Sequence, residues 1–445
     1  MTIEICTVGG YNEVGKNMTA IKVGDSVVIM DMGLHIENYV RVRDEENDSG
    51  SITVASLQKA DAVPDDRAIA DWRKNVKLIV PTHAHLDHVG AIPFMASHYG
   101  VPVVATPYTI EVIKAILRDE KIKIKNELKV LNANSHLRVN KELDLEFVNI
   151  THSTPQTVVG VLHTSEGVVV YANDFKLDNN PILGTKPNVE RLRELGQQGV
   201  DVLIMDGTRA ARSGKTPSES IAKEMLRDVM LGSDLKDGLI IVTTFSSHIA
   251  RLKSIIEFGR KLNRKIVFLG RSLSKYVEAA EAIGLVNFSD EVEIVKYSKQ
   301  VKRRLSQINK EKRNRYLLVV TGHQGEPESV LSRIARQELQ FELYPEDAII
   351  FSCSVIPNPS NIANRELLES QLKRYKVRMF KDIHTSGHAS KEDLRDMLNM
   401  LKPKHLVPAH GDFTMLSAMA DLAIEMGYTL GQNLHIMHNG QRIRL

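Results

Sequence analysis

Four side chains that can bind metal ions lie within the six residues His83-Ala84-His85-Leu86-Asp87-His88. The apolar run that precedes them, 78–81, predicts a buried strand that ends at Pro81. In an extended chain His83 and His85 point to the same side, whereas Asp87 and His88 come where a helix could begin. The cluster therefore predicts two imidazoles for one metal ion and a carboxylate plus an imidazole for a second. Such a pair of sites indicates a metal-dependent hydrolase.

Polar side chains follow three other predicted strands, and a two-metal site needs them because the first cluster supplies too few ligands. His152 follows the apolar run 147–151, Asp174 follows 168–173, and His410 follows 404–409. Their shared position after strands favours a common site, in which Asp174 is the expected bridging carboxylate. Histidine and carboxylate ligands without thiolates favour zinc, and they are also compatible with manganese.

The composition is that of an ordinary globular protein, with 42% hydrophobic and 25% charged residues in a chain of 445. This length predicts two or three domains. The formal net charge of +3 neither demands nor excludes a polyanionic partner. Cys6 and Cys353 lie outside any Cys-x-x-Cys pattern, which argues against a disulfide framework and fits a reducing compartment. Without a secretion signal or a run of about 18 apolar residues, we expect a soluble cytoplasmic protein with no membrane segment.

The first two hundred residues alternate short apolar runs with turn signals, which predicts a series of strands. Pro102 must lie at the start or edge of its strand, because it cannot donate a hydrogen bond to the ladder. The segment 36–71 is polar and acidic, and we interpret it as a long loop or insertion near the site. The predicted strands span 20–23, 27–31, 77–80, 101–104, 145–148 and 167–171.

Helices and strands alternate from about Thr216 onward. The sequence Thr216-Pro217-Ser218-Glu219 is a capping box with proline at the first helical position, and it predicts a helix through 226–228. A further helix is expected through 252–256. This rhythm is typical of a parallel βαβ sheet and predicts a second α/β domain over 208–380. Its predicted strands span 239–244, 265–269, 316–320 and 348–351.

The run 404–412 is similar to the first metal cluster, since both are apolar strands that end in proline, a small residue and histidine. The sequence pattern of the first domain is therefore found again at the end of the chain. We expect one domain, formed by 1–207 and 381–445, that is split by the inserted domain.

These residues resemble a known family. The cluster 83–88 with His152, Asp174 and His410 resembles the metallo-β-lactamase superfamily, and Asp206, His388 and His410 in their local sequences resemble its β-CASP nuclease branch. Further segments, in the same order, are similar to the ribonuclease J family in its shorter archaeal form. The resemblance covers essentially the whole chain, and it implies an αββα metallo-β-lactamase sandwich with an inserted parallel-sheet α/β domain. The segments are 242–247, 262–265, 270–272, 322–327 and 401–404.

The resemblance also implies roles for individual residues. His83, His85 and His152 would bind one of two zinc ions, Asp87, His88 and His410 the other, and Asp174 both. Ions about 3.5–4 Å apart can hold a bridging hydroxide that attacks phosphorus. His388 would contact the scissile phosphate and assist the departing 3′ oxygen, and Asp206 would orient ligand imidazoles, so that Asp87, His388 and Asp206 form the catalytic set. Residues 390–393 are expected to cap the next helix and fix the loop of His388.

A pocket for a 5′ monophosphate is expected from the same resemblance. Arg271 in Gly-Arg-Ser, Ser352 and Ser354 in Phe-Ser-Cys-Ser, His384 and His388 are the substrate-binding candidates, because guanidinium, hydroxyl and backbone N–H groups suit phosphate oxygens. For Arg271 and Ser354, ordinary turn formation is an equal alternative. The basic run 299–315 favours an RNA backbone and a solvated helix face equally.

Two features depart from the family pattern. The chain ends about 35 residues after His410, where bacterial members carry a further domain, and this puts their oligomer architecture in doubt. The segment 356–361 reads Ile-Pro-Asn-Pro-Ser-Asn where the family commonly has Ile-Pro-Gly-Asn-Glu, which puts the details of the phosphate pocket in doubt.

The resemblance therefore implies a zinc-dependent 5′-3′ exoribonuclease that acts on single-stranded RNA with a 5′ monophosphate, as a homodimer. A β-CASP endonuclease of the RNA 3′-end processing type would share every metal ligand. A small-ester or thioester hydrolase would not need the inserted domain. A non-catalytic RNA-binding protein would be expected to have lost ligands.

Overall fold

A computed structural model describes residues 2–46 and 52–445 of the chain. The chain folds into two compact units. Unit 1 comprises Met1–Asn179, Gly184–Thr216 and Gly387–Leu445, and unit 2 comprises Asn180–Leu183 and Pro217–Ser386. The fold of unit 1 is thus completed by the last segment of the chain.

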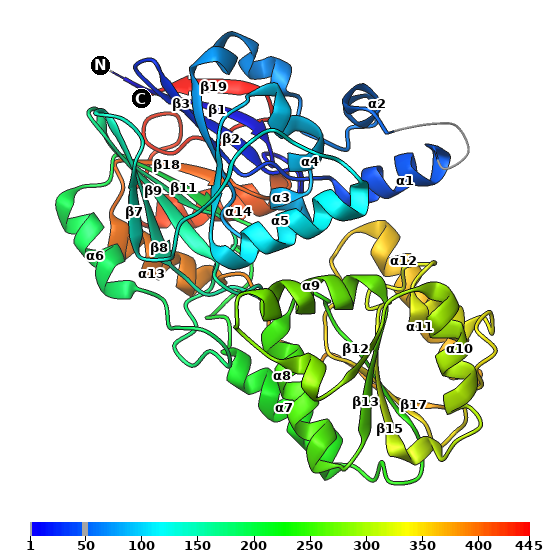
Figure 1. Cartoon of the computed structure of the whole chain (residues 1–445). Coiled ribbons are helices and arrows are strands. Elements are labelled where there is room, and N and C mark those ends of the chain that lie inside the picture. The colour runs from blue at the N-terminus through cyan, green and yellow to red at the C-terminus, as the bar shows by residue number, and fades with distance from the viewer. Residues whose placement is uncertain (1, 47–51) are drawn as a thin grey trace. The chain divides into compact units, whose positions relative to one another are not determined.

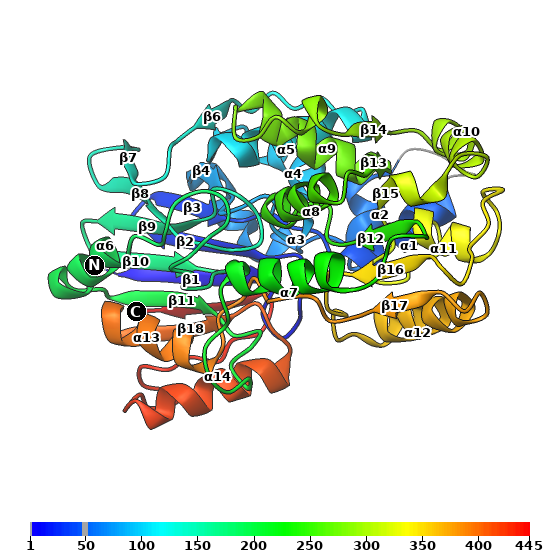
Figure 2. The same cartoon turned by 90° about the horizontal axis from the view of Figure 1, so that it is seen from below.

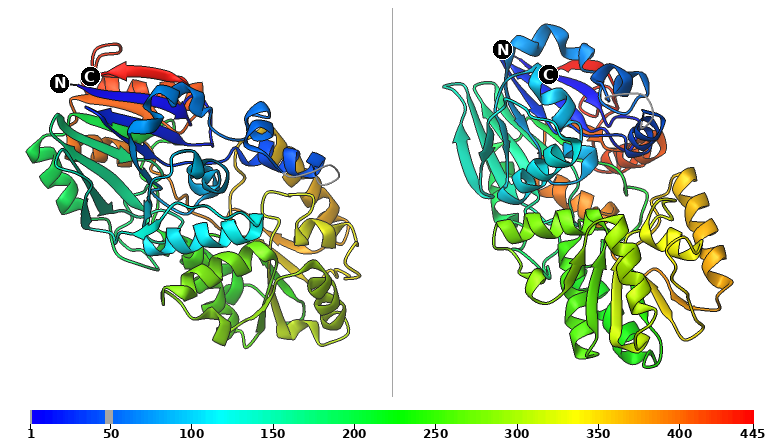
Figure 3. Two further views of the ribbon diagram at one scale, coloured as in Figure 1. Left: turned by 45° about the horizontal axis from the view of Figure 1, so that its top comes forward. Right: turned by 45° about the vertical axis from the view of Figure 1, so that its right-hand side comes forward.

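The first sheet of unit 1 has seven strands within the described ranges, in the order β19-β1-β2-β3-β4-β5-β6. Strands β19, β1, β2 and β3 pair antiparallel, whereas β3 to β6 run parallel. Because β19 pairs with β1, the two ends of the chain lie side by side (Figures 1 and 3). The strands are β1 (Ile3–Gly9), β2 (Met18–Val23), β3 (Ser26–Met30), β4 (Val76–Val80), β5 (Val103–Ala105), β6 (Leu128–Val130) and β19 (Gln441–Arg444).

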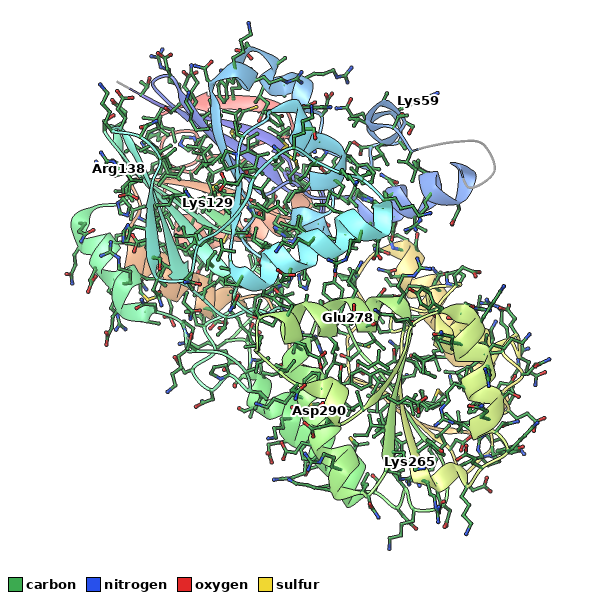
Figure 4. The ribbon with its side chains drawn as sticks, in the orientation of Figure 1. Lys59, Lys129, Arg138, Lys265, Glu278 and Asp290 are labelled. Carbon is green, nitrogen blue, oxygen red and sulfur yellow. The ribbon has the colours of Figure 1, made fainter. Side chains whose placement is uncertain are left out.

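The second sheet of unit 1 has the order β18-β11-β10-β9-β8-β7 in the part of the chain that the structure describes. Strand β18 comes from the end of the chain and pairs parallel with β11, so that the C-terminal segment extends a sheet begun by the N-terminal one. Arg138, labelled in Figure 4, lies on the edge strand β7. The strands are β7 (Ser135–Arg138), β8 (Leu143–Asn149), β9 (Val158–Thr164), β10 (Gly167–Ala172), β11 (Val202–Asp206) and β18 (His405–Ala409).

The two sheets pack face to face, and helices cover their outer faces. Val169 and Tyr171 of β10 join the core between the sheets, whereas Val170 and Ala172 face α6, α13 and α14. This alternation follows from the two-residue period of a strand. Figure 2 shows α13 and α14 beyond β18. The αββα sandwich predicted from the resemblance is confirmed. The helices that cover the second sheet are α6 (Val189–Gln198), α13 (Lys391–Leu401) and α14 (Phe413–Glu425).

The remaining helices of unit 1 precede or follow strands of the first sheet. In the described residues no helix combines the length and the apolar character needed to cross a bilayer. Pro102 lies directly before β5, as predicted. These helices are α1 (Ile36–Glu46), α2 (Val54–Lys59), η1 (Asp66–Asn75), α3 (Leu86–Val89), α4 (Ile92–Met95), η2 (Ala96–His98) and α5 (Pro107–Glu120).

The prediction of a long loop over 36–71 is wrong, because the described part of this segment is largely helical. Thr53 accepts a hydrogen bond from the backbone of Ser56 and so caps α2. Tyr39, Val42 and Leu57 are buried and anchor α1 and α2. The few apolar residues of these helices stand among many polar and acidic ones, and the sequence pattern therefore gave no clear helix signal. Residues 47–51 of this segment lie outside the described ranges.

Unit 2 contains a six-stranded sheet of the order β14-β13-β15-β12-β16-β17, and its described strand pairs are all parallel. The predicted parallel βαβ sheet is therefore confirmed. Lys265, labelled in Figure 4, marks the start of β13. The strands are β12 (Ile240–Thr243), β13 (Lys265–Leu269), β14 (Glu293–Val295), β15 (Tyr316–Val320), β16 (Ala348–Phe351) and β17 (Arg378–Phe380).

Helices cover both faces of this sheet. Figure 1 shows α7, α8 and α9 on one face and α10, α11 and α12 on the other. Residues of α10, α11 and α12 share one apolar core with β12, β13, β15 and β16. The helices are α7 (Glu219–Gly232), α8 (Ile249–Lys261), α9 (Arg271–Ala282), η3 (Phe288–Asp290), α10 (Ser298–Ile308), η4 (Arg313–Arg315), α11 (Val330–Ala335) and α12 (Pro359–Lys373).

The predicted capping box at Thr216 is wrong. Helix α7 begins at Glu219, and its N-cap is Ser218, whose side chain accepts a hydrogen bond from the backbone of Ser220. Thr216 belongs to unit 1, where its backbone N–H donates to Asp393. The helix therefore begins two residues later than predicted and without a capping box, because a second serine that can act as N-cap follows the proline.

Candidate metal centre

Seven side chains predicted as metal ligands come together in unit 1, each from the end of a strand or the start of a helix. The loop after β4 carries His83 and His85, and the short helix α3 carries Asp87 and His88. Strands β8, β10 and β18 lead to the other three, which are His152, Asp174 and His410. The carboxyl ends of neighbouring strands meet at one edge, and this is why residues far apart in sequence converge here.

One group of ligand atoms surrounds a point between His83, His85, His152 and Asp174. His85 Nδ1 lies 3.1 Å from His83 Nε2 and 3.2 Å from His152 Nε2. Asp174 Oδ2 lies 3.4 Å from both His83 Nε2 and His152 Nε2. Ligand atoms about 2.0–2.1 Å from a tetrahedral zinc ion stand about 3.3–3.4 Å apart, so these distances match such an ion.

A second group is formed by Asp87, His88 and His410 together with the other oxygen of Asp174. Asp174 Oδ1 lies 3.2 Å from His88 Nε2 and 3.3 Å from His410 Nε2. Asp87 Oδ2 lies 3.6 Å from His88 Nε2 and 3.7 Å from His410 Nε2. Asp174 therefore offers one oxygen to each group, which is the geometry of a bridging ligand.

The burial of Asp174 and the protonation of His83, His85 and His152 fit bound cations. Asp174 Oδ1 is buried and has no hydrogen-bond donor among residues 2–46 and 52–445, a costly arrangement that a cation would relieve. Burial and the neighbouring His83 lower the pKa of His85 to about 3. Burial also lowers the pKa of His83 and that of His152. Neutral imidazoles with facing lone pairs are ready ligands for divalent metal ions.

Three residues that sequence reasoning missed hold the ligand imidazoles in place. His88 Nδ1 donates to Asp31 Oδ2 at 2.7 Å, and His410 Nδ1 donates to Asn17 Oδ1 at 2.9 Å. His83 Nδ1 lies 3.1 Å from the hydroxyl of Thr82, which donates in turn to Asp31. Such partners fix the orientation of metal-binding histidines. Asp31 follows a strand and was detectable by the same rule as Asp174, whereas no sequence signal marks Asn17.

The backbone at this edge adopts conformations that cost free energy. Asp31, Asp174 and His410 have φ angles of 59°, 48° and 56°, in the left-handed region that non-glycine residues rarely adopt. Gly33 lies so close to α3 that a Cβ atom there would be 1.7 Å from the carbonyl oxygen of Asp87. Strain of this kind persists at functional sites because the surrounding structure holds it.

His388 lies beside the ligands without belonging to either group. Its Nε2 is 3.7 Å from Asp174 Oδ2, and its Nδ1 is 2.8 Å from Asp206 Oδ2. The side chain of Thr208 donates to Asp206 Oδ1 at 2.7 Å and lies 3.1 Å from His388 Nδ1. Burial opposes the charged form of His388, but Asp174 and Asp206 outweigh it and raise its pKa to about 9.

The predicted contact of Asp206 with ligand imidazoles is wrong. In the described chain the side chain of Asp206 bonds to His388 and Thr208. The ligand imidazoles are held instead by Asp31, Asn17 and the carbonyl oxygen of Gly387, which accepts from His152 Nδ1 at 2.7 Å. The reason is that β11 ends beside the loop of His388, a relationship that the sequence does not contain.

The loop of His388 is tied to the start of α13, as the capping prediction requires. Ser390 is the N-cap of this helix, and Asp393 accepts hydrogen bonds from the backbone of Ser390 at 3.2 Å and of Thr216 at 2.7 Å. Thr216 donates through its hydroxyl to the carbonyl oxygen of His388 at 2.7 Å. These bonds fix the backbone that presents His388.

Four of the five substrate-binding candidates lie in unit 2 and differ in their surroundings, whereas His388 lies in unit 1. The hydroxyl of Ser352 donates to the carbonyl oxygen of Ile383 at 2.9 Å and is buried. His384 Nδ1 lies 3.5 Å from Arg251 Nη1. Arg271 begins α9 and is exposed, and so is Ser354. The structure thus links Ser352 and His384 through Arg251, and it leaves Arg271 and Ser354 facing solvent.

Arg251 is a fully buried residue that sequence reasoning missed. Its guanidinium donates to Glu219 through Nε at 2.5 Å and through Nη2 at 2.8 Å, and to the carbonyl oxygen and hydroxyl of Ser352, both at 2.9 Å. Burial would raise the pKa of Glu219, but His248 and Arg251 hold it well below its ordinary value. A lone arginine in a helix pattern carries no signal of burial.

Models of known families match most of the chain. Residues 12–240 match the metallo-β-lactamase superfamily, 237–367 match the ribonuclease J β-CASP domain, and 374–436 match a zinc-dependent metallo-hydrolase RNA specificity domain. The matches follow one another along the chain.

Curated relatives are similar over the whole chain. Ribonuclease J of Methanocaldococcus jannaschii is 43% identical over 99% of this chain and 98% of its own, and ribonuclease J of Pyrococcus abyssi is 44% identical over 100% and 97%. Ribonuclease J 1 of Streptococcus pyogenes is 31% identical over 100% of this chain and 74% of its own. A solved structure of a protein of unknown function from Enterococcus faecalis has a TM-score of 0.65 at 17% identity and covers both chains fully, which shows a shared fold.

Proposed function

The chain belongs to the ribonuclease J family of the metallo-β-lactamase superfamily, and from this premise we propose that it hydrolyses phosphodiester bonds of RNA at the metal centre of unit 1. The observation that carries the proposal is the position of Asp174, which offers one oxygen to each of two ligand groups, with His388 beside it. A dinuclear centre with a neighbouring proton donor suits the displacement of an oxygen from phosphorus.

The metal ions in this proposal are two zinc ions, with manganese as the alternative. His83, His85 and His152 would hold one ion, Asp87, His88 and His410 the other, and Asp174 both. When bound, the ions supply Lewis acidity and lower the pKa of a water molecule toward neutrality. Asp31, Asn17 and Thr82 orient the imidazoles for this task.

His388 has a different role in the reaction. Its Nδ1–H donates to Asp206, which leaves Nε2 on the side of Asp174. We infer that Nε2–H donates to a non-bridging oxygen of the scissile phosphate and then gives its proton to the departing 3′ oxygen. Asp206 does not touch the substrate in this mechanism, because it acts by fixing the ring and by stabilising the imidazolium form.

The direction of cleavage is proposed to be 5′ to 3′ on single-stranded RNA with a 5′ monophosphate. The support is the family and the polar groups at the strand ends of unit 2, where Ser352 and His384 are held by Arg251. Arg271 and Ser354 are proposed to complete the phosphate contacts from their exposed positions. We also propose a homodimer in the cytoplasm, and light scattering of the purified chain tests the dimer.

The decisive experiment is a time course on one RNA that carries a 5′ monophosphate, triphosphate or hydroxyl end. We expect a labelled 5′ mononucleotide as the first product, released fastest from the monophosphate. Internal fragments that ignore the 5′ end would replace the proposal with an endonuclease of the 3′-end processing type. Retained binding without cleavage in zinc or manganese would instead indicate a non-catalytic RNA-binding protein.

A matched pair of histidine variants tests the metal mechanism. His85→Ala removes one of the three histidines proposed to hold the first ion. It should therefore lower both the zinc content and the rate of RNA cleavage. His438→Ala removes an exposed histidine of unit 1 and should change neither. Normal cleavage by folded His85→Ala would overturn the mechanism.

A further inference from the structure

We propose that the outer face of α10 in unit 2 is a second RNA-binding surface, which holds the sugar-phosphate backbone of the substrate through residues that take no part in the metal centre. The inference rests on the proposed function and adds a contact to it. The surface consists of Lys299, Lys302, Arg303 and Lys310 with the polar residues between them.

The four cations lie on one side of α10 because of their spacing. Val301, Leu305 and Ile308 are buried and pack into the core of the unit 2 sheet. Positions 299, 302 and 303 are separated by three and four residues, which places them on a common face, and residue 310 continues this row beyond the end of the helix. A rise of about 1.5 Å per residue extends the row over about 16 Å, enough for several nucleotides.

These cations lack the counter-ions that their neighbours have. Arg304 on the same helix bonds to Glu293 at 2.8 Å and lies 3.5 Å from Glu311, and Arg313 bonds to Asp347. Within the two described ranges no ion pair involves Lys299, Lys302, Arg303 or Lys310, and their side chains are exposed. Like charges three and four residues apart weaken a helix. A polyanion bound along the row would remove this repulsion.

The surface is hollowed, and its lining suits phosphates. A cavity of about 380 Å³ is lined by the four cations together with Ser306, Gln307 and Gln340. Every lining side chain is charged or carries a hydroxyl or amide group, so each can donate a hydrogen bond to a phosphate oxygen. No aromatic side chain lines it in the described residues, and therefore we expect no stacking of bases and no sequence preference.

The same lining favours RNA over an acidic protein. Stable protein interfaces have an apolar or aromatic centre with charges at the rim. Here the lining consists of four cations and three uncharged polar side chains, and it contains no apolar side chain among the residues described. A chain with one negative charge at every repeat matches such a row better than a folded partner does.

The test compares two charge-reversal variants in a His85→Ala background, so that RNA is bound without being cut. Lys302→Glu/Arg303→Glu alters the surface, and Lys236→Glu/Lys253→Glu makes the same charge change at exposed positions elsewhere in unit 2. The probe is a 30-nucleotide single-stranded RNA, and binding is followed by fluorescence anisotropy between about 50 and 200 mM salt.

The surface variant should weaken binding roughly tenfold at low salt and reduce the logarithmic salt slope by about 1.4, the value for two lost contacts with a single strand. The control should retain both values. Equal effects of the two variants would overturn the inference, because they would reflect net charge alone. Unchanged RNA binding by the surface variant would also overturn it and would leave an acidic protein as the partner.

A second measurement separates this inference from the proposed function. With His85 intact, the surface variant should cleave a six-nucleotide RNA at the normal rate and a 30-nucleotide RNA more slowly at low concentration. If the unaltered protein did not cleave RNA, the proposed nuclease activity would be refuted. The binding test would still show whether the surface on α10 binds RNA. Equal slowing on both RNAs would refute the surface.

Discussion

His388 Nδ1 lies 2.8 Å from Asp206 Oδ2, and this hydrogen bond joins a ring at the metal centre to a carboxylate at the end of β11. Asp206 is 1% exposed, whereas the side chain of His388 is 26% exposed. A buried carboxylate therefore anchors the Nδ1 side of a ring whose Nε2 faces Asp174. The hydroxyl of Thr208 donates to Asp206 and fixes the carboxylate in turn.

Asp206→Asn should reduce RNA cleavage roughly 10- to 100-fold, the range found when an orienting partner is removed. The metal content should not change, because Asp206 touches no predicted ligand. Thr208→Val should also reduce RNA cleavage, but by a smaller factor. Turnover rates and zinc content of the purified variants check both statements. Loss of zinc in Asp206→Asn would show that the residue supports the ligands after all.

Asp31→Asn, unlike Asp206→Asn, should lower the affinity of the protein for metal. The carboxylate of Asp31 accepts from His88 and from both the backbone and the hydroxyl of Thr82. Its replacement should weaken metal binding roughly 10- to 100-fold. A chelator titration of the loaded protein measures this affinity. If Asp31→Asn and Asp206→Asn released metal equally, the division of roles between the two carboxylates would be wrong.

Removal of metal should lower the thermal stability of unit 1. Without a cation Asp174 Oδ1 is a buried acceptor without a donor in the described residues. A ligand at about a hundredfold excess over its Kd stabilises a protein by about 2.7 kcal/mol. The melting temperature should fall on treatment with a chelator and recover with zinc. His438→Ala should respond as the unaltered protein does, and His85→Ala should respond less.

Arg251→Met should destabilise unit 2 by about 3–5 kcal/mol, because it removes the arginine from the ion pair of the buried carboxylate of Glu219. Glu219→Gln in the same chain should recover part of this loss. Urea unfolding of the single and double variants measures the difference. A double variant no more stable than Arg251→Met would contradict the charge explanation.

The single variant should also discriminate less between 5′ phosphate and 5′ hydroxyl RNA, because Arg251 holds Ser352 and His384.

Glu146 should make stability depend on pH. Burial alone would raise its pKa, but hydrogen bonds from His163 and Arg191 lower it to about 2. Because the folded pKa lies below the ordinary value of about 4.3, the stabilisation is complete above about pH 5 and is lost as pH falls toward 2. Glu146→Gln should therefore cost stability at pH 7 and progressively less below pH 4. Urea unfolding at several pH values checks this, and a constant difference would contradict it.

Much of the fold was predictable from local patterns. The apolar runs at 27–31, 77–80 and 265–269 correspond to β3, β4 and β13 because buried strands need continuous or alternating apolar residues. Patterns failed where the local signal was weak or duplicated. The described parts of the segment 36–71 form helices with few buried apolar residues, and α7 begins at the second of two possible caps.

The sequence by itself determined which residues are candidate metal ligands and that the strands of unit 2 run parallel, because the spacing of neighbouring residues and strand periodicity are local properties. Only the tertiary structure decided the partners of these ligands. Asn17 meets His410 across 393 residues of chain, and His388 meets Asp206 across 182. No local pattern encodes such pairs, since they arise when separate strands pack edge to edge. Among the residues that the structure describes, the fold also leaves Lys302 and Arg303 without a carboxylate partner while it pairs Arg304 with Glu293.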